Sequence, residues 1–248
     1  MGRTFAIGDL HGDLDAFHRL AERLPPLAED DTIVFLGDYI DRGPRSREVV
    51  ELVRRLDRDE RCEVVCLRGN HEDAWLRVID EGWPEFLLPG PNGCLAMYRS
   101  YEGGPMPRPG EYPRPDELDR MERGAFLPEA HVAWMRSLPY WYEDEHAIYV
   151  HAGLVERGGR FLHPSEADTP IAMLWTRSRR FFREYAGKRV VVGHTATELL
   201  PQELSTHTPE DPTDLWAGPC VVALDTGAGK GGFLTCVELP AMNVYESR

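Results

Sequence analysis

The sequence predicts an α/β domain built from layers of helices and strands, and two observations lead to this prediction. Six short, mostly apolar runs each end in a cluster of glycine and polar residues, which is typical of buried strands. The segments between the early runs carry apolar residues at helical spacing. Alternating strands and helices are characteristic of layered α/β domains.

The predicted elements follow one another along the chain. Strands are expected at residues 4–7, 33–36, 64–67, 148–150, 190–192 and 221–224. Helices are expected at residues 14–24 and 48–56, because their apolar side chains recur on one face. Strands, turns and helices therefore alternate over the first third of the chain.

The middle of the chain differs, because many of the 20 prolines lie within residues 82–145. Residues 103–115 are predicted to be a loop or mobile flap, since proline cannot sit inside a regular helix. A short helix is expected at 130–138, closed by Pro139. We expect residues 1–248 to form a single domain with a Pro/Gly-rich insertion or flap at about 84–129.

Composition limits the classes of function. No run of about 18 apolar residues occurs, so no membrane-spanning helix is expected. The net charge of −14 argues against nucleic acid or an anionic membrane as partner, but not against an anionic substrate at a local site. The five cysteines include no CxxC pair, which favours reduced thiols. The N-terminus lacks the basic region and apolar stretch of a signal peptide, so a cytoplasmic location is expected. No heptad pattern indicates assembly, so a monomer is expected.

Polar clusters follow the first three predicted strands: GDLHG at 8–12, GDYIDRG at 37–43 and GNHE at 69–72. Ligands usually bind at the carboxyl ends of strands in α/β sheets. Carboxylate and amide oxygens together with imidazole nitrogens suit Mn, Fe or Zn, and the clusters contain no cysteine for a structural zinc site. Two such ions about 3.5–4 Å apart would activate water for attack on phosphorus. The Arg42 guanidinium could donate bidentate hydrogen bonds to phosphate oxygens.

With HAG at 151–153, LWTR at 174–177, GHT at 193–195 and LDTGAGKGG at 224–232, the sequence resembles the calcineurin-like metallophosphoesterases. Within them it is similar to the bacterial form of the phosphoprotein (serine/threonine) phosphatase family. The resemblance spans the whole chain and is weakest between residues 84 and 129. It implies a four-layer α/β/β/α sandwich with a dinuclear metal centre at one sheet edge.

The resemblance also implies a role for each motif residue. The expected metal ligands are Asp9, His11, Asp38, Asn70, His151 and His194, with Asp38 bridging both ions. His71 would protonate the leaving alkoxide, and Asp41 would orient its imidazole. The expected phosphate contacts are Arg42, Arg177 and Asn70, although Arg179 and Arg180 are close enough in sequence to replace Arg177. The implied cofactor is two divalent ions, manganese first, with Fe, Zn or Ni as alternatives.

Three further positions near the motifs carry weaker expectations. Glu72 is expected to support its neighbours or the helix start, and Asp225 to order the loop after its strand. Many relatives carry an aromatic residue where this chain has Lys230. That lysine could add positive charge for a second phosphate or an acidic substrate, but a solvent-facing side chain is the simpler expectation.

The activity implied by the resemblance is hydrolysis of phosphomonoesters by direct attack of metal-bound hydroxide, without a phosphoenzyme. Phosphoserine and phosphothreonine proteins are the expected substrates, with phosphotyrosine also open. The intact residues Asp41, Arg42 and Glu72 favour this class over diadenosine tetraphosphate hydrolases, which usually differ there. The main alternative is a hydrolase of dinucleoside polyphosphates or capped RNA ends. A non-catalytic metal-binding module is a remote alternative, because it would need no proton donor such as His71.

Overall fold

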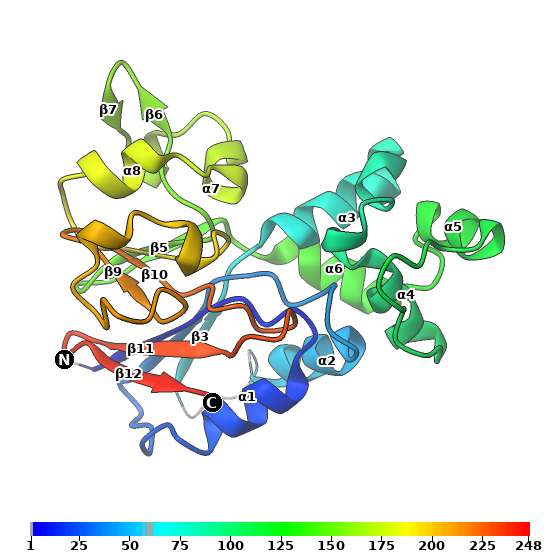
Figure 1. The fold of residues 1–248 in the computed structure, drawn as a ribbon, viewed down its shortest axis with the longest axis horizontal. Helices are drawn as coiled ribbons and strands as arrows, with labels where there is room; N and C mark the ends of the chain where they lie inside the picture. Colours follow the sequence, from blue (N-terminus) through cyan, green and yellow to red (C-terminus); the bar gives the residue numbers. More distant parts are fainter. Residues whose placement is uncertain (1, 57, 59–61) are drawn as a thin grey trace.

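The computed structural model describes residues 2–56, 58 and 62–248. Within these residues, ten strands form two five-stranded sheets that lie face to face, with helices on their outer sides (Figure 1). Two further strands, β6 (Glu156–Arg157) and β7 (Arg160–Phe161), form a separate antiparallel hairpin.

The first sheet has the strand order β12-β11-β1-β2-β3. Its strands are β1 (Thr4–Ile7), β2 (Thr32–Phe35), β3 (Glu63–Cys66), β11 (Thr235–Leu239) and β12 (Asn243–Glu246). β1, β2 and β3 run parallel and in register, so that their last residues, Ile7, Phe35 and Cys66, lie side by side. β11 and β12 extend the sheet antiparallel. The loops that follow β1, β2 and β3 therefore leave from the same edge.

The second sheet has the order β4-β5-β8-β10-β9. Its strands are β4 (Trp141–Glu143), β5 (Ile148–Val150), β8 (Val190–Val192), β9 (Trp216–Ala217) and β10 (Val221–Ala223). The three central strands, β5, β8 and β10, are parallel, and β4 and β9 pair antiparallel at the edges. The loops after β5 and β8 thus also share one edge.

Helices complete the layers on both sides. α1 (Leu14–Ala21) and α2 (Ser46–Leu56) cover the outer face of the first sheet, and α7 (Ile171–Trp175) and α8 (Arg179–Glu184) cover that of the second (Figure 1). The space between the sheets is filled by apolar side chains from both, including Val34, Tyr149 and Val191, all fully buried. This arrangement confirms the predicted four-layer α/β/β/α sandwich.

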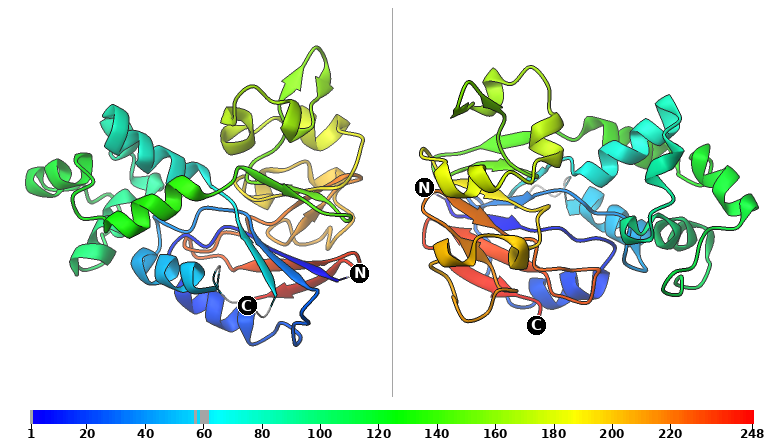
Figure 2. Two further views of the ribbon diagram at one scale, coloured as in Figure 1. Left: turned by 180° about the vertical axis from the view of Figure 1, so that it is seen from behind. Right: turned by 45° about the horizontal axis from the view of Figure 1, so that its top comes forward.

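Four further helices form a lobe beside the sheets, on the right in Figure 1 and on the left when the molecule is seen from behind (Figure 2). They are α3 (Asn70–Glu81), α4 (Cys94–Glu102), α5 (Pro115–Glu122) and α6 (Glu129–Ser137). Short 3₁₀ turns occur at Pro84–Phe86, Gly90–Asn92, Pro164–Glu166, Thr197–Leu199 and Gln202–Leu204.

The proline-rich segment is more helical than its sequence indicates. The predicted loop is present between α4 and α5, and α6 matches the expected helix at 130–138 within one residue. α4 and α5 were not predicted. Pro115 is tolerated because it occupies the first turn of α5, where its missing N–H has no partner to lose. The edge strands β4, β9 and β12 were also missed, and so was β11, which pairs antiparallel between β12 and β1. Short or antiparallel strands carry no long apolar run.

Leu20 tests the packing of α1 on the first sheet. Its side chain is fully buried in the core beneath that sheet, whereas Leu27 is 41% exposed. We expect Leu20→Ala to lower the free energy of unfolding by about 2–5 kcal/mol, because it removes buried methyl groups and leaves a cavity. Leu27→Ala is the matched control and should stay within about 0.5 kcal/mol. Urea denaturation of both variants measures the difference, and equal losses would contradict this packing.

Candidate active site

The predicted site residues come together where the two sheets meet the helical lobe. They follow parallel strands. Asp9 and His11 lie in the loop after β1, Asp38 after β2, His151 after β5 and His194 after β8, and Asn70 and His71 begin α3 after β3. All six expected metal ligands are at most 4% exposed. Side chains from five separate segments, between residues 9 and 194, thus share one buried cluster.

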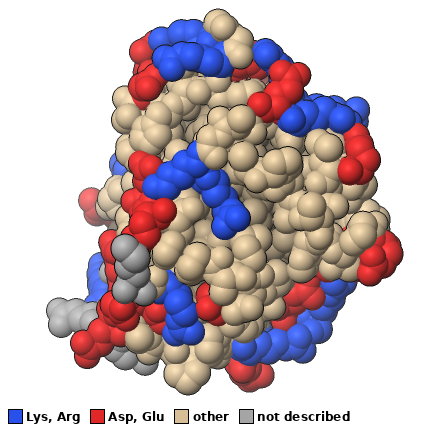
Figure 3. Space-filling model, turned by 90° about the vertical axis from the view of Figure 1, so that its left-hand side faces the viewer, with Lys and Arg blue, Asp and Glu red and all other residues tan. Residues whose placement is uncertain are grey.

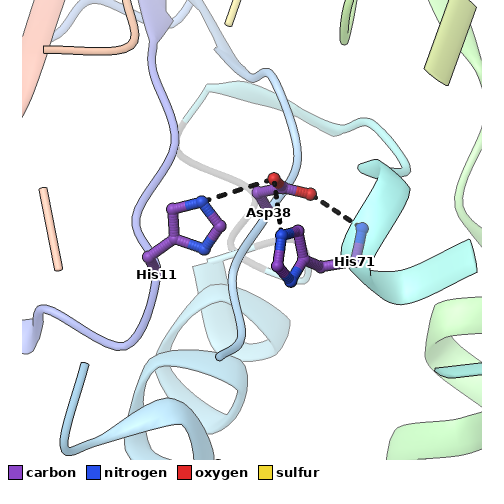
Figure 4. A group of neighbouring side chains, drawn as sticks. All are labelled: His11, Asp38 and His71. Carbon is purple, nitrogen blue, oxygen red and sulfur yellow. Dashed lines mark hydrogen bonds and ion pairs between the residues drawn. The ribbon is translucent and has the colours of Figure 1, made fainter. Parts of the chain in front are cut away.

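One carboxylate oxygen of Asp38 faces a first group of imidazoles. Its Oδ2 lies 3.4 Å from Nε2 of His11 and 3.9 Å from Nε2 of His71, and Figure 4 shows both rings turned toward Asp38. Oδ2 of Asp9 lies 3.8 Å from Nε2 of the same His11. His11, Asp38 and His71 form a three-residue set that suits a metal, with ligand atoms within 4.8 Å of one another. His71 therefore lies among the possible ligand atoms, although its expected role is that of proton donor.

The other oxygen of Asp38 faces a second group. Its Oδ1 lies 3.5 Å from Nε2 of His151, and Asp38, His151 and His194 form a second three-residue set that suits a metal. Oδ1 of Asn70 lies 2.8 Å from both Nε2 of His151 and Nδ1 of His194. The His194 backbone N–H donates to the Asp9 carboxylate and links the two groups. Asp38 thus stands between two candidate ion positions.

The orientation and the neutral state of the imidazole rings suit cation binding. Nδ1 of His11 lies 2.8 Å from the Ile40 carbonyl oxygen, and Nδ1 of His151 lies 2.9 Å from that of Leu36. Each Nδ1–H therefore donates to backbone, which leaves the Nε2 lone pair facing the cluster, as in metal-binding histidines. Burial lowers the pKa values of His11, His151 and His194, so the rings are neutral at neutral pH.

The charges and unpartnered atoms of the cluster also fit bound cations. Burial, followed by the charges of Asp225 and Asp38, raises the pKa of Asp9 well above its ordinary value. Crowded buried carboxylates of this kind are stabilised by a divalent ion. Nε2 of His194 is buried and has no hydrogen-bond partner among the described residues. The residues present therefore fit a pair of divalent ions.

Glu72 fixes the loop that carries Asp38. Its carboxylate accepts hydrogen bonds from the backbone N–H groups of Asp38 at 3.0 Å, Tyr39 at 2.9 Å and Gly69 at 3.0 Å. Burial and the nearby charge of Asp38 raise the pKa of Glu72 to about 8, although these three hydrogen bonds act in the opposite direction. The contacts agree with the predicted supporting role and join the loops after β2 and β3.

The backbone of the site is unusual. Of the seven non-glycine residues in the described chain with positive φ, five belong to this cluster: His11, Asp38, Asp41, Arg42 and His194. Such conformations cost about 1–3 kcal/mol each and persist where surrounding contacts impose them. The Asp38 carbonyl accepts the N–H groups of both Leu10 and His11, which holds two of these loops together. Sequence patterns carry no sign of this strain, because the residues are not glycines.

His71 and Asp41 form the expected pair. Nδ1 of His71 lies 2.6 Å from Oδ2 of Asp41, and both side chains are buried. The indole N–H of Trp75 donates to the same carboxylate, 3.0 and 3.1 Å from its two oxygens. Sequence reasoning missed Trp75. The available signal was its position four residues after His71, which places both on one face of α3.

Arg42 connects the site to the proline-rich segment. Its guanidinium contacts Nε2 of His11, and its Nε donates to the Pro91 carbonyl at 3.3 Å. Its backbone N–H donates to Gly93, which has a φ of +77°. A Cβ at position 93 would lie 2.2 Å from the Arg42 nitrogen, so only glycine allows this approach. The segment between α3 and α4 therefore forms the wall that orients Arg42.

The remaining cations are placed unequally. Arg177 is exposed and donates from Nη1 to the His194 carbonyl at 3.2 Å, at the edge of the cluster. Arg180 pairs with Glu156 and Glu184 on the surface, so the structure places Arg177 rather than Arg180 at the site. Lys230 is exposed at the surface, as expected, but it also has a buried partner. Its Nζ lies 3.1 Å from Oδ2 of the buried Asp225, because that carboxylate needs a cationic partner.

Asp225 also performs the ordering role expected of it, since its carboxylate accepts the Gly227 backbone N–H at 3.2 Å.

Away from the site, the end of the molecule opposite the lobe carries acidic and basic side chains interspersed around a mainly uncharged centre (Figure 3). In the described residues, no helix combines the length and apolarity needed to cross a membrane.

Comparison with known proteins relates this geometry to a family. Residues 2–198 match the family model of the calcineurin-like phosphoesterases. A Caenorhabditis elegans protein named for the serine/threonine-protein phosphatases is 41% identical over 73 residues, which are 29% of this chain and 20% of that protein. A symmetrical bis(5'-nucleosyl)-tetraphosphatase of Dechloromonas aromatica is 34% identical over 83 residues, which are 34% of this chain and 28% of that protein. The chain thus matches less than a third of either relative's length.

A crystal structure named for the diadenosine tetraphosphatases has a TM-score of 0.59 over 99% of this chain and 92% of that one, at 18% sequence identity. At this identity the similarity shows a shared fold. The family match, in contrast, covers most of the chain and includes the loops that carry Asp9, Asp38, Asn70, His151 and His194. The chain therefore belongs to the calcineurin-like phosphoesterase family.

Proposed function

We propose that the protein is a metal-dependent phosphatase that hydrolyses phosphomonoesters, with phosphoserine and phosphothreonine in proteins as its substrates. The observation that carries this proposal is the buried pair of His71 and Asp41, whose atoms Nδ1 and Oδ2 lie 2.6 Å apart. A serine or threonine alkoxide is a poor leaving group and needs a proton as its bond to phosphorus breaks. A phosphate leaving group has less need of one. The pair therefore supports a phosphomonoester of an alcohol.

The proposed cofactor is a pair of divalent ions, manganese first, with Fe, Zn or Ni accepted by the same donors. Asp9, His11 and Asp38 would hold one ion, and Asp38, Asn70, His151 and His194 the other. When bound, such ions supply Lewis acidity to the phosphoryl oxygens and lower the pKa of water. The proposals of a single domain, a monomer and a cytoplasmic location rest on the sequence features alone.

The protein side chains supply the proton for the leaving group and bind the phosphate oxygens. Asp41 accepts the hydrogen bond from Nδ1–H of His71, which leaves Nε2 to pass a proton to the leaving oxygen. The Trp75 indole donates to Asp41 and keeps that carboxylate in place. Arg42 and Arg177, with the Asn70 amide, contact the phosphate oxygens and stabilise the charge that develops on them.

The test of the proposed function compares a phosphoserine peptide with diadenosine tetraphosphate, both with manganese present. Faster hydrolysis of the peptide is expected. Faster hydrolysis of the dinucleotide would favour the activity for which the Dechloromonas relative is named, with the same metal ligands. No hydrolysis of either compound or of p-nitrophenyl phosphate would favour the non-catalytic module.

Removal of one ligand should lower metal binding. His151 is fully buried in the second group, so we expect His151→Ala to lower the manganese retained per chain by about half or more. His163→Ala is the matched control, because His163 is half-buried on the surface and pairs with Glu143. Elemental analysis after gel filtration, with circular dichroism to verify folding, makes the comparison. Equal metal content in both variants would contradict the assigned ligand set.

Replacing the proton donor should separate substrates by leaving group. We expect His71→Asn to slow hydrolysis of a phosphoserine peptide about 10²–10⁴-fold, since the alkoxide must leave without a proton. The loss with p-nitrophenyl phosphate should be smaller, because nitrophenolate leaves readily. The ratio of the two kcat values measures the effect, and bound metal is measured alongside. A collapse of the metal content would show that His71 is a ligand instead.

A further inference from the structure

A hollow adjoins the site, and recognition of the phosphate group alone does not explain it. A hollow of about 570 Å³ lies between the segment before and within α4, at residues 87–96, and the loop 106–113. Arg42 lines it from the site, and so do Gly229 and Lys230 from the loop after β10. We call this hollow the flanking pocket. Because Arg42 is also a proposed phosphate contact, part of a substrate next to its phosphate would enter this pocket.

The flanking pocket is positively charged in a protein with a net charge of −14. Three cationic side chains line it, Arg42, Arg108 and Lys230, against one carboxylate, Glu111. Glu111 is already engaged, since Oε1 lies 2.6 Å from the Arg99 guanidinium and Oε2 accepts the backbone N–H of Arg108. Local charge of this sign attracts anionic groups even on an acidic protein.

Apolar side chains are exposed at the same place. Leu88, Met106 and Tyr112 are 44%, 51% and 71% exposed, and all three line the flanking pocket. They are half of the six large apolar side chains exposed in the described part of the chain. Methionine and tyrosine are enriched where proteins bind other chains, because they supply contact area that adapts to a partner. An inorganic anion would leave this apolar surface unused.

We propose that the flanking pocket binds the residues beside the phosphorylated side chain of an acidic phosphopeptide. Carboxylates of the peptide would meet Arg108 and Lys230, and an apolar residue further along would pack against Leu88, Met106 and Tyr112. Lys230 is partly neutralised by Asp225, so Arg108 makes the larger contribution to the preference for acidic residues. This inference rests on the proposed function, because it concerns the peptide that carries the phosphate.

The test uses the manganese-loaded protein and three phosphoserine peptides that differ only in flanking residues: acidic, neutral or basic. We expect kcat/KM to be about tenfold higher for the acidic than for the neutral peptide and lowest for the basic one, with the differences shrinking as salt is added. Arg108→Glu should lower the acidic-to-neutral ratio about fivefold or more, and Arg108→Gln should lower it less.

Arg123→Glu is the matched control. Arg123 is exposed in the same lobe and pairs with Asp119, but it does not line the flanking pocket. It should keep the acidic-to-neutral ratio of the unaltered protein. Because the Arg108 side chain is exposed and its backbone makes the loop contact with Glu111, both Arg108 variants should fold.

The outcomes separate this inference from the proposed function. Hydrolysis of all three peptides at similar rates, or an acidic preference that survives in Arg108→Glu, would overturn the inference and leave the proposed function standing. An equal loss of preference in Arg123→Glu would also overturn it, since the effect would then follow total charge. Hydrolysis of diadenosine tetraphosphate but of no peptide would overturn both.

Discussion

The site depends on the position of a single carboxylate, that of Asp38. One oxygen faces His11 and His71, and the other faces His151, so this side chain joins the two halves of the cluster. Its backbone has a φ of +55°, which is costly for aspartate, and Glu72 holds its N–H while two residues of the first loop hold its carbonyl. Glu72 thus joins the loops after β2 and β3, and the Asp38 carbonyl joins the loop after β1 to them.

The position of this cluster follows from the fold. Parallel strands bring the segments after β1, β2 and β3 to one edge of the first sheet and the loops after β5 and β8 to one edge of the second. Because the sheets pack face to face, these edges meet, and Asp9 in the first reaches His194 in the second. The helical lobe then closes the remaining side. α3 presents Asn70 and His71 at its start and Trp75 one turn later, and Gly93 before α4 holds the backbone of Arg42. The lobe is therefore part of the site, and it also forms the flanking pocket.

The sequence predicted the parts of the structure that are marked by local chemistry. Apolar runs that end in clusters of glycine and polar residues identified β1, β2, β3, β5, β8 and β10, and these polar residues supplied the site cluster. Features that depend on tertiary contacts were missed. The contact between the Trp75 indole and Asp41 was missed, and so was the ion pair between the exposed Lys230 and the buried Asp225. α4 and α5 were missed because proline and glycine there lie at the ends of short helices and do not prevent them from forming.

We propose that Asp38 would bridge two divalent ions while His71 stays free to donate a proton. The most direct measurement is a crystal structure of the manganese-loaded protein with anomalous diffraction. We expect two anomalous peaks about 3.5–4 Å apart, on either side of the Asp38 carboxylate, with His71 still paired with Asp41. A single peak held by His11, Asp38 and His71 would contradict it, because His71 would then be a ligand and the proposed proton donor would be lost.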